Sequence, residues 1–312
     1  MSVHICELLQ VMTIKDVSER FQMHWHTVKE IEKEYLKKKH DHINIKGVEY
    51  IAIDEFAIQK GHKYMTVVMD LKSSKILYVG DGRAANCLDG FWLKIRKYKS
   101  NIKAVAMDMW DPYIAATKAW VPKADEKIVF DRYHVMRMIL TAVDKVRKQE
   151  HRELLAQNID LLKGTKYLWL WNEENIPQYR RDEFEELRSR DLKVCRARAI
   201  KDNLRHLWNY RKTGWMRHFF NDWFSWAVRS RLQPIVKAAR SIKAHLENII
   251  TYAKQRITNA LGESLNSKIE KVKRLACGYR NRAHYRTAIF FHCGGLDLYP
   301  KRTDSPLQII AA

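Results

Sequence analysis

The stretch that decides the fold is VEYIAID, at residues 48–54. It joins β-branched and aromatic side chains in a short run that ends on an acid, Asp54, and this composition is typical of a buried strand. Two more β-rich runs follow at residues 64–70 and 75–79, with turn residues between the runs. The segment therefore predicts three antiparallel strands that follow one another along the chain.

After residue 80 the pattern alternates between helices and strands. It predicts strands at residues 103–108 and 127–130, and helices at residues 86–98, 111–120 and 131–155. The order β-β-β-α-β-α-β-α predicts an α/β fold, a mixed sheet with helices on both faces, and it is the element order of an RNase H-like domain. A right-handed crossover puts the first and fourth strands side by side. We therefore expect Asp54 and Asp108, at the ends of these two strands, to approach each other.

The N-terminal segment predicts two short helices, at residues 13–21 and 27–36, each with apolar residues at helical spacing. A short connection between them gives the layout of a helix-turn-helix, whose second helix enters the major groove of DNA. An ordinary helical hairpin is the alternative. Only twelve residues precede Thr13, so we expect no complete three-helix unit there. The charged residues 37–42 are expected to form a linker, and residues 1–42 a DNA-binding remnant.

The strand pattern is lost after residue 156. Residues 157–250 are charged, predict helices and hold six of the ten tryptophans, so they are expected to form an all-helical insertion between the two parts of the catalytic domain, residues 43–156 and 251–293. Large aromatic side chains more often anchor a core than offer a stacking surface for bases. Residues 294–312 are expected to form a tail.

The charge balance favours polyanionic partners. Lys and Arg number 57 against 36 Asp and Glu, a net charge of +21, which points to nucleic acid first and to an anionic membrane second. No apolar run approaches the roughly 20 residues of a membrane-spanning helix, and no signal-peptide pattern begins the chain. The five cysteines are scattered without a C-x-x-C pair, which argues against a zinc ribbon and suits packed, reduced thiols in a cytoplasmic protein.

Three acids in separate contexts, Asp54, Asp108 and Glu263, are the candidate catalytic and metal-binding residues. Mg²⁺ prefers hard oxygen ligands, so a few carboxylates suffice to hold it. Two such ions roughly 3.5–4 Å apart activate the attacking oxygen of a phosphoryl transfer and stabilise the leaving one. Taken singly, each of the two aspartates could simply terminate a strand, and Glu263 could lie on a surface helix.

Neighbouring acids have simpler expected roles. Asp111 is expected to cap the helix that starts at Pro112, and Asp131 either to cap a helix or to lie at the edge of the site. Glu55 follows Asp54 directly and is expected to point to the opposite face of the strand.

Five stretches in order carry a resemblance to a known family. They are IDE at 53–55 with KYMTVVMD at 63–70, AMDMWDPY at 106–113, IVFDRYHV at 128–135, TNALGESLN at 258–266 and KRLACGYRN at 273–281. With these motifs the chain resembles the DDE-type transposases of bacterial insertion sequences, and among them the ISL-three group, over most of residues 45–291.

The resemblance implies an RNase H-like polynucleotidyl transferase. It implies that Asp54, Asp108 and Glu263 hold two Mg²⁺ ions, with Mn²⁺ as a substitute, and that the partners are double-stranded DNA at the element ends and the target. It also implies a homo-oligomer, at least a dimer on DNA, and a bacterial protein that associates with the nucleoid. Members usually begin with a cysteine-rich, zinc-binding segment, so this chain has a shortened N-terminus. They often carry Lys or Arg seven residues after the catalytic Glu, where this chain has Glu270.

A basic segment near the end of the chain is the candidate DNA-binding surface. Its cations are Lys268, Lys271, Lys273, Arg274, Arg280, Arg282 and Arg286. Tyr279, His284 and Tyr285 lie among them, and aromatic rings can stack on splayed bases. The alternative is a solvated charged face.

Two other functions share parts of this pattern. An RNase H-like nuclease would have the same acids and cleave DNA without joining it. A non-catalytic DNA-binding remnant or regulator would bind DNA without needing a metal.

We expect the affinity of the protein for DNA to fall steeply as salt rises, because each phosphate neutralised by Lys or Arg releases counterions. Fluorescence anisotropy with a labelled duplex at a series of NaCl concentrations measures the slope. An affinity that does not change with salt would contradict the charge argument.

Overall fold

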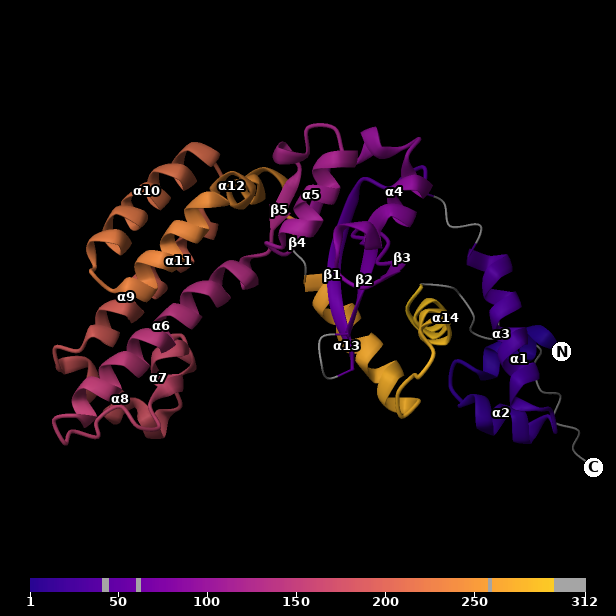
Figure 1. The fold of residues 1–312 in the computed structure, drawn as a ribbon, viewed down its shortest axis with the longest axis horizontal. Coiled ribbons are helices and arrows are strands. Elements are labelled where there is room, and N and C mark those ends of the chain that lie inside the picture. Colours follow the sequence, from indigo (N-terminus) through magenta and orange to yellow (C-terminus); the bar gives the residue numbers. More distant parts are fainter. Residues whose placement is uncertain (41–44, 60–62, 258–259, 295–312) are drawn as a thin grey trace, which may run out of the picture. The chain divides into compact units, whose positions relative to one another are not determined.

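The computed structural model describes residues 1–40, 45–59, 63–257 and 260–294, and the chain divides into two compact units (Figure 1). One unit comprises Met1–Asn101 together with Ala260–Ala312, and the other comprises Ile102–Asn259. None of the helices in the described ranges has the length and apolar character needed to cross a membrane. The predicted tail after Gly294 and the turn around Gly61 lie outside the described residues.

The strands form one five-stranded mixed sheet in the order β3-β2-β1-β4-β5, as the element order predicts. In the first unit β1, β2 and β3 pair antiparallel, and in the second unit β4 and β5 pair parallel, with Val105 opposite Ile128. Their bounds are Tyr50–Gln59, Lys63–Asp70, Ile76–Asp81, Ala104–Met107 and Ile128–Phe130. Ile51, Ala52 and Ile53 on β1 are all buried. Consecutive buried residues show that both faces of this strand are covered.

Strand β1 is longer than the sequence predicts. It continues past Asp54 to Gln59 because the segment keeps its pairing with β2, with Asp54 opposite Val67 and Phe56 opposite Met65. Asp54 therefore lies in the middle of a strand, and the expectation that it ends the strand was wrong. Asp108 does directly follow β4.

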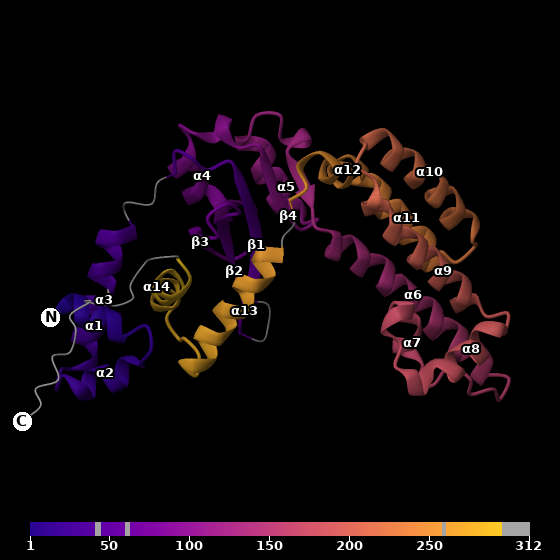
Figure 2. The same cartoon turned by 180° about the vertical axis from the view of Figure 1, so that it is seen from behind.

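Three helices accompany the sheet in the first unit. The predicted helix at 86–98 begins as a 3₁₀ turn and continues as α4, Asp89–Ile95, which buries Phe91, Trp92 and Ile95. Helix α13, Ala260–Leu275, contacts β1, and helix α14, Arg282–Cys293, contacts β3. Figure 2 shows α13 beside β1 from the other side.

The N-terminal residues form three helices, α1 (Ser2–Leu8), α2 (Ile14–Arg20) and α3 (Trp25–His40). Thr13 caps α2 through a reciprocal pair of contacts with Asp16. The helix α1 was not expected, and α3 runs to His40, so residues 37–40 are helical instead of a linker. Residues 41–44 lie outside the described ranges.

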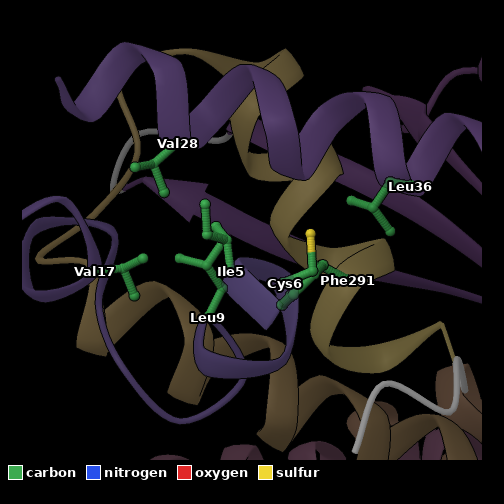
Figure 3. Close-up of a cluster of buried hydrophobic side chains, with 7 residues drawn as sticks. All are labelled: Ile5, Cys6, Leu9, Val17, Val28, Leu36 and Phe291. Carbon is green, nitrogen blue, oxygen red and sulfur yellow. The ribbon is translucent and has the colours of Figure 1, made fainter. Parts of the chain in front are cut away.

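The N-terminal helices share a core with α14. Its buried residues, drawn in Figure 3, are Ile5, Cys6, Leu9, Val17, Val28, Leu36 and Phe291. In Figure 3 the side chains of Ile5 on α1 and of Leu9 just after it point toward Val17 and Val28 of the next two helices. Helix α1 forms because its apolar residues complete this core, and Phe291 closes one side of it.

The second unit is mostly helical. Helix α6 packs against α7, α9 and α11, and α12 packs against β5. The helices are α5 (Asp111–Trp120), α6 (Arg132–Leu155), α7 (Lys166–Leu170), α8 (Arg181–Ser189), α9 (Lys193–Leu204), α10 (Thr213–Arg229), α11 (Gln233–Ala244) and α12 (Leu246–Gln255). Trp169, Trp208 and Trp223 are buried anchors, whereas Trp215 and Trp226 are exposed.

A buried carboxylate joins two of these helices. Glu150 on α6 accepts hydrogen bonds from the backbone N–H groups of Lys193, at 2.6 Å, and Val194, at 2.8 Å. These N–H groups begin α9 and have no partner inside the helix, so a carboxylate satisfies them and also interacts favourably with the helix dipole. The contact fixes the start of α9 on α6.

We predict that Glu32 makes the stability of the first unit depend on pH. Burial raises the pKa of this carboxyl on α3 from 4.5 to about 7, partly offset by the charge of Lys29. Between pH 4.5 and 7 the folded protein holds a proton that the unfolded chain has released, so stability is lost as the pH rises through this window. Replacing Glu32 by Gln removes the loss, which is up to about 3 kcal/mol.

Urea unfolding at pH 5 and pH 8 measures this effect, and E34Q at an exposed position of the same helix is the control. The prediction would be contradicted if the free energy of unfolding of E32Q fell between pH 5 and pH 8 by as much as that of the parent protein.

Candidate active site

Asp54 is a buried carboxylate, with 8% of the residue exposed. Its Oδ1 accepts a hydrogen bond from the backbone N–H of Glu55 at 2.8 Å, and its Oδ2 accepts one from Nδ2 of Asn266 at 2.8 Å. Hydrogen bonds to the charged form offset part of the cost of burying an ionised acid. Asn266 lies on α13, so this helix supplies a partner that the strand itself lacks.

Helix α13 is held against β1 at a second point. The Nζ of Lys273 donates to the backbone carbonyl of Ala57 at 3.1 Å and pairs with Glu270 at 3.0 Å. Leu265 and Ile269 on the same helix are buried. The apolar face and the two polar contacts together fix the helix along the strand.

Glu263 lies on α13, three residues before Asn266. Residues three apart lie on the same side of a helix, so position 263 is one turn away from the residue that binds Asp54. The side chain of Glu263 lies outside the described residues.

Asp108 lies in the second unit, directly after β4. Its Oδ1 is buried, and Nε2 of His134 lies 2.8 Å from it, yet no described donor meets this oxygen with hydrogen-bond geometry. His134 is in the first turn of α6, which Asp131 caps by accepting from the N–H of Tyr133 at 2.8 Å. The cap places His134 beside Asp108.

The other acids near the motifs have structural roles. Asp131 is the helix cap that the sequence suggested as one of two roles. Asp111 was expected to be a cap as well, but α5 begins at Asp111 itself and Trp110 occupies the cap position. Glu55 is half-buried and pairs with Arg83 at 3.5 Å.

The donors fit a hard divalent cation. In the first unit Asp54 offers carboxylate oxygens, and Oδ1 of Asn266 is a buried amide oxygen without a hydrogen-bond partner among the described residues; in the second unit Asp108 offers a carboxylate of its own. Magnesium binds such oxygens and keeps several waters. Among the described side chains no three His, Cys, Asp or Glu residues gather closely enough to hold a metal ion. The triad with Glu263 therefore stays a prediction.

The sequence analysis missed two residues of this site, Asn266 and His134. Both lie inside motifs that the sequence analysis quoted, TNALGESLN and IVFDRYHV. A usable signal was their spacing of three residues from Glu263 and Asp131, which places each one turn further along a helix.

The basic segment is only partly free for DNA. Lys268, Lys271, Arg274, Arg280 and Arg282 are exposed. Lys273 is tied to β1, and Arg286 pairs with Asp81 at 2.7 Å. These last two cations are engaged within the protein.

One aromatic residue of the segment, Tyr285, belongs to the core. Tyr285 is fully buried, meets Phe56 edge-on at a ring distance of 5.8 Å and stacks on Tyr279 at 4.6 Å. Burial raises the pKa of Tyr279 to about 12. The expectation that Tyr285 could stack on a base was wrong, because its ring packs from α14 against Phe56 on β1.

We predict that Y285A lowers the free energy of unfolding by about 3–5 kcal/mol, the usual cost of removing a buried aromatic ring. Y285F loses only the contact of the hydroxyl with the carbonyl of Ile269, at 3.4 Å, and should cost about 1 kcal/mol. Urea unfolding measures both, with R282A at an exposed position as the control. A Y285A variant as stable as the parent would refute the core assignment.

Most of the chain is similar to known proteins. A family model described as transposase, of the ISL-three type of DDE proteins, matches residues 51–289. The transposase for insertion sequence element IS1001 of Bordetella parapertussis is 29% identical over 283 residues, covering 89% of this chain and 69% of the relative. The transposase for insertion sequence element IS1557 of Mycobacterium tuberculosis, strain CDC 1551 / Oshkosh, is 24% identical over 282 residues, covering 82% and 63%. The chain thus spans about two thirds of the length of these curated relatives. It belongs to the ISL-three family of DDE transposases.

Proposed function

We propose that the protein cleaves and joins DNA at the ends of an insertion sequence, with Asp54, Asp108 and Glu263 as the ligands of two Mg²⁺ ions, for which Mn²⁺ can substitute. The observation that carries the proposal is the contact between buried Asp54 and α13, the helix on which Glu263 lies. In a chain of this family, a contact between Asp54 on β1 and the helix that carries Glu263 supports a site shared by these two acids.

The residues would act through their charge and position. Asp54 and the Oδ1 atom of Asp108 are buried, and burying a negative oxygen is unfavourable. A bound cation would offset this cost. When bound, the two ions would activate an attacking oxygen and stabilise the leaving oxygen of a phosphodiester. Asn266 and His134, at 2.8 Å from Asp54 and Asp108 respectively, would restrict the orientation of these acids.

The proposed reaction has two steps of the same kind. Water attacks the phosphodiester at the element end, its oxygen forms the new bond to phosphorus, and the bond to the 3′ oxygen breaks to leave a 3′ hydroxyl. That hydroxyl then attacks a phosphodiester of the target, and the target's own 3′ oxygen leaves. No covalent bond between protein and DNA is needed in either step.

Exposed cations would bind the substrate. Five of the seven predicted DNA-binding residues are exposed, and the net charge of the chain is +21. Helices α2 and α3 would supply a further contact if they act as a helix-turn-helix. Double-stranded DNA is the proposed partner, with at least two copies of the chain holding a pair of ends.

We predict that D108N abolishes Mg²⁺- or Mn²⁺-dependent nicking of supercoiled plasmid. The loss should exceed about 100-fold, because removing a residue that only supports a ligand already costs about 10- to 100-fold. Gel analysis of nicked plasmid over time measures the rate. D111N is the matched control, since Asp111 lies three residues further on, at the start of α5.

Two outcomes would decide against the proposal. Nicking by D108N at the rate of the parent would refute the role of this acid. Cleavage by the parent without joining, on a substrate that carries element ends, would identify a nuclease instead of a transposase.

A further inference from the structure

The contact between Asn266 and Asp54 joins residues 212 positions apart and is partly buried. A carboxylate oxygen can only accept a hydrogen bond, so the amide of Asn266 must turn its NH₂ group toward Asp54. The orientation of this amide therefore follows from its partner. It leaves Oδ1 of Asn266 on the other side.

The side-chain oxygen of Asn266 has a cost that an apolar residue at this position would not have. Oδ1 of Asn266 is buried and has no hydrogen-bond partner among the described residues. Burying an unsatisfied polar atom is unfavourable, whereas an apolar side chain of similar shape would pack without that cost. The docking of α13 on β1 has other sources, the buried Leu265 and Ile269 and the bond from Lys273 to Ala57. Asn266 is thus not needed to hold the helix in place.

We propose that Asn266 is a positioning residue for the metal ligand Asp54. Its NH₂ group fixes Oδ2, while the N–H of Glu55 fixes Oδ1, so the carboxylate plane is held from two sides. These two contacts would restrict the orientation in which the carboxylate meets a divalent cation. This inference rests on the proposed function of Asp54.

The same contact links the ligand on the strand to the helix that carries Glu263. Position 263 is one helical turn before Asn266. The hydrogen bond at position 266 therefore orients Asp54 from the same helix that carries Glu263.

Binding of Mn²⁺ to the full chain, measured by isothermal titration calorimetry, tests the proposal. The informative variant is N266L, which keeps the approximate shape of the side chain and removes the donor. N248L is the matched control, because Asn248 also donates from a buried amide, to the carbonyl of Asp125 at 3.0 Å, but touches no acid side chain in the described structure. D54N reports the loss of the ligand itself.

We expect N266L to raise the Kd for Mn²⁺ about 10- to 100-fold, as other residues that support a metal ligand do. N248L should bind Mn²⁺ like the parent even if it melts at a lower temperature, and D54N should lose binding. The Mn²⁺ concentration for half-maximal plasmid nicking should shift in parallel for N266L, with most of the rate recovered at saturating Mn²⁺. The N266Q variant keeps an amide donor one methylene further out and should give an intermediate Kd. If N266L does not fold, the Kd of N266Q for Mn²⁺ tests the proposal in its place.

Parent-like Mn²⁺ binding by N266L, with D54N defective, would overturn the positioning role and leave the proposed function standing. No Mn²⁺ binding by the parent chain would overturn both.

Discussion

The structure depends on burying one negative charge in the middle of a covered strand. Asp54 lies on β1 among residues that are buried on both faces, and a carboxylate there is stable only with polar partners. The strand offers one backbone N–H, and α13 offers the amide of Asn266. The late helix must therefore dock on the first strand, and the apolar residues of α13 and the bond from Lys273 to Ala57 make that docking specific. The proposed cation would offset the remaining cost of burying this charge.

Local patterns were sufficient for most of the fold. The β-rich runs gave all five strands, and the helix predicted at 111–120 has those bounds in α5. Boundaries failed where pairing overrode local composition. Strand β1 continues through Asp54 and Glu55 because each residue faces a partner on β2, and an acid at the end of an apolar run does not reveal that. The motifs also contained Asn266 and His134, which contact the acids of the candidate site, but the motifs alone assigned these two residues no role.

Contacts over long sequence distances were beyond local patterns. Asn266 meets Asp54 across 212 positions, and nothing near Asn266 in the sequence names its partner. The same holds for Tyr285, whose surroundings in the sequence are basic and suggested a surface, although its ring packs on Phe56. The charge of the neighbours was visible, whereas the direction of the side chain depends on the packing of α14.

The shared core of the N-terminal helices and α14 has a consequence for how the chain is made. Phe291, which closes the core of α1 to α3, lies 255 residues after Leu36 and is synthesised well after these helices. At about 5–20 residues per second, the interval is on the order of tens of seconds. During that time Ile5, Leu9 and Val28 lack a full cover, and the nascent chain presents an apolar surface that chaperones recognise. The N-terminal helices therefore reach their final packing only after α14 has been translated.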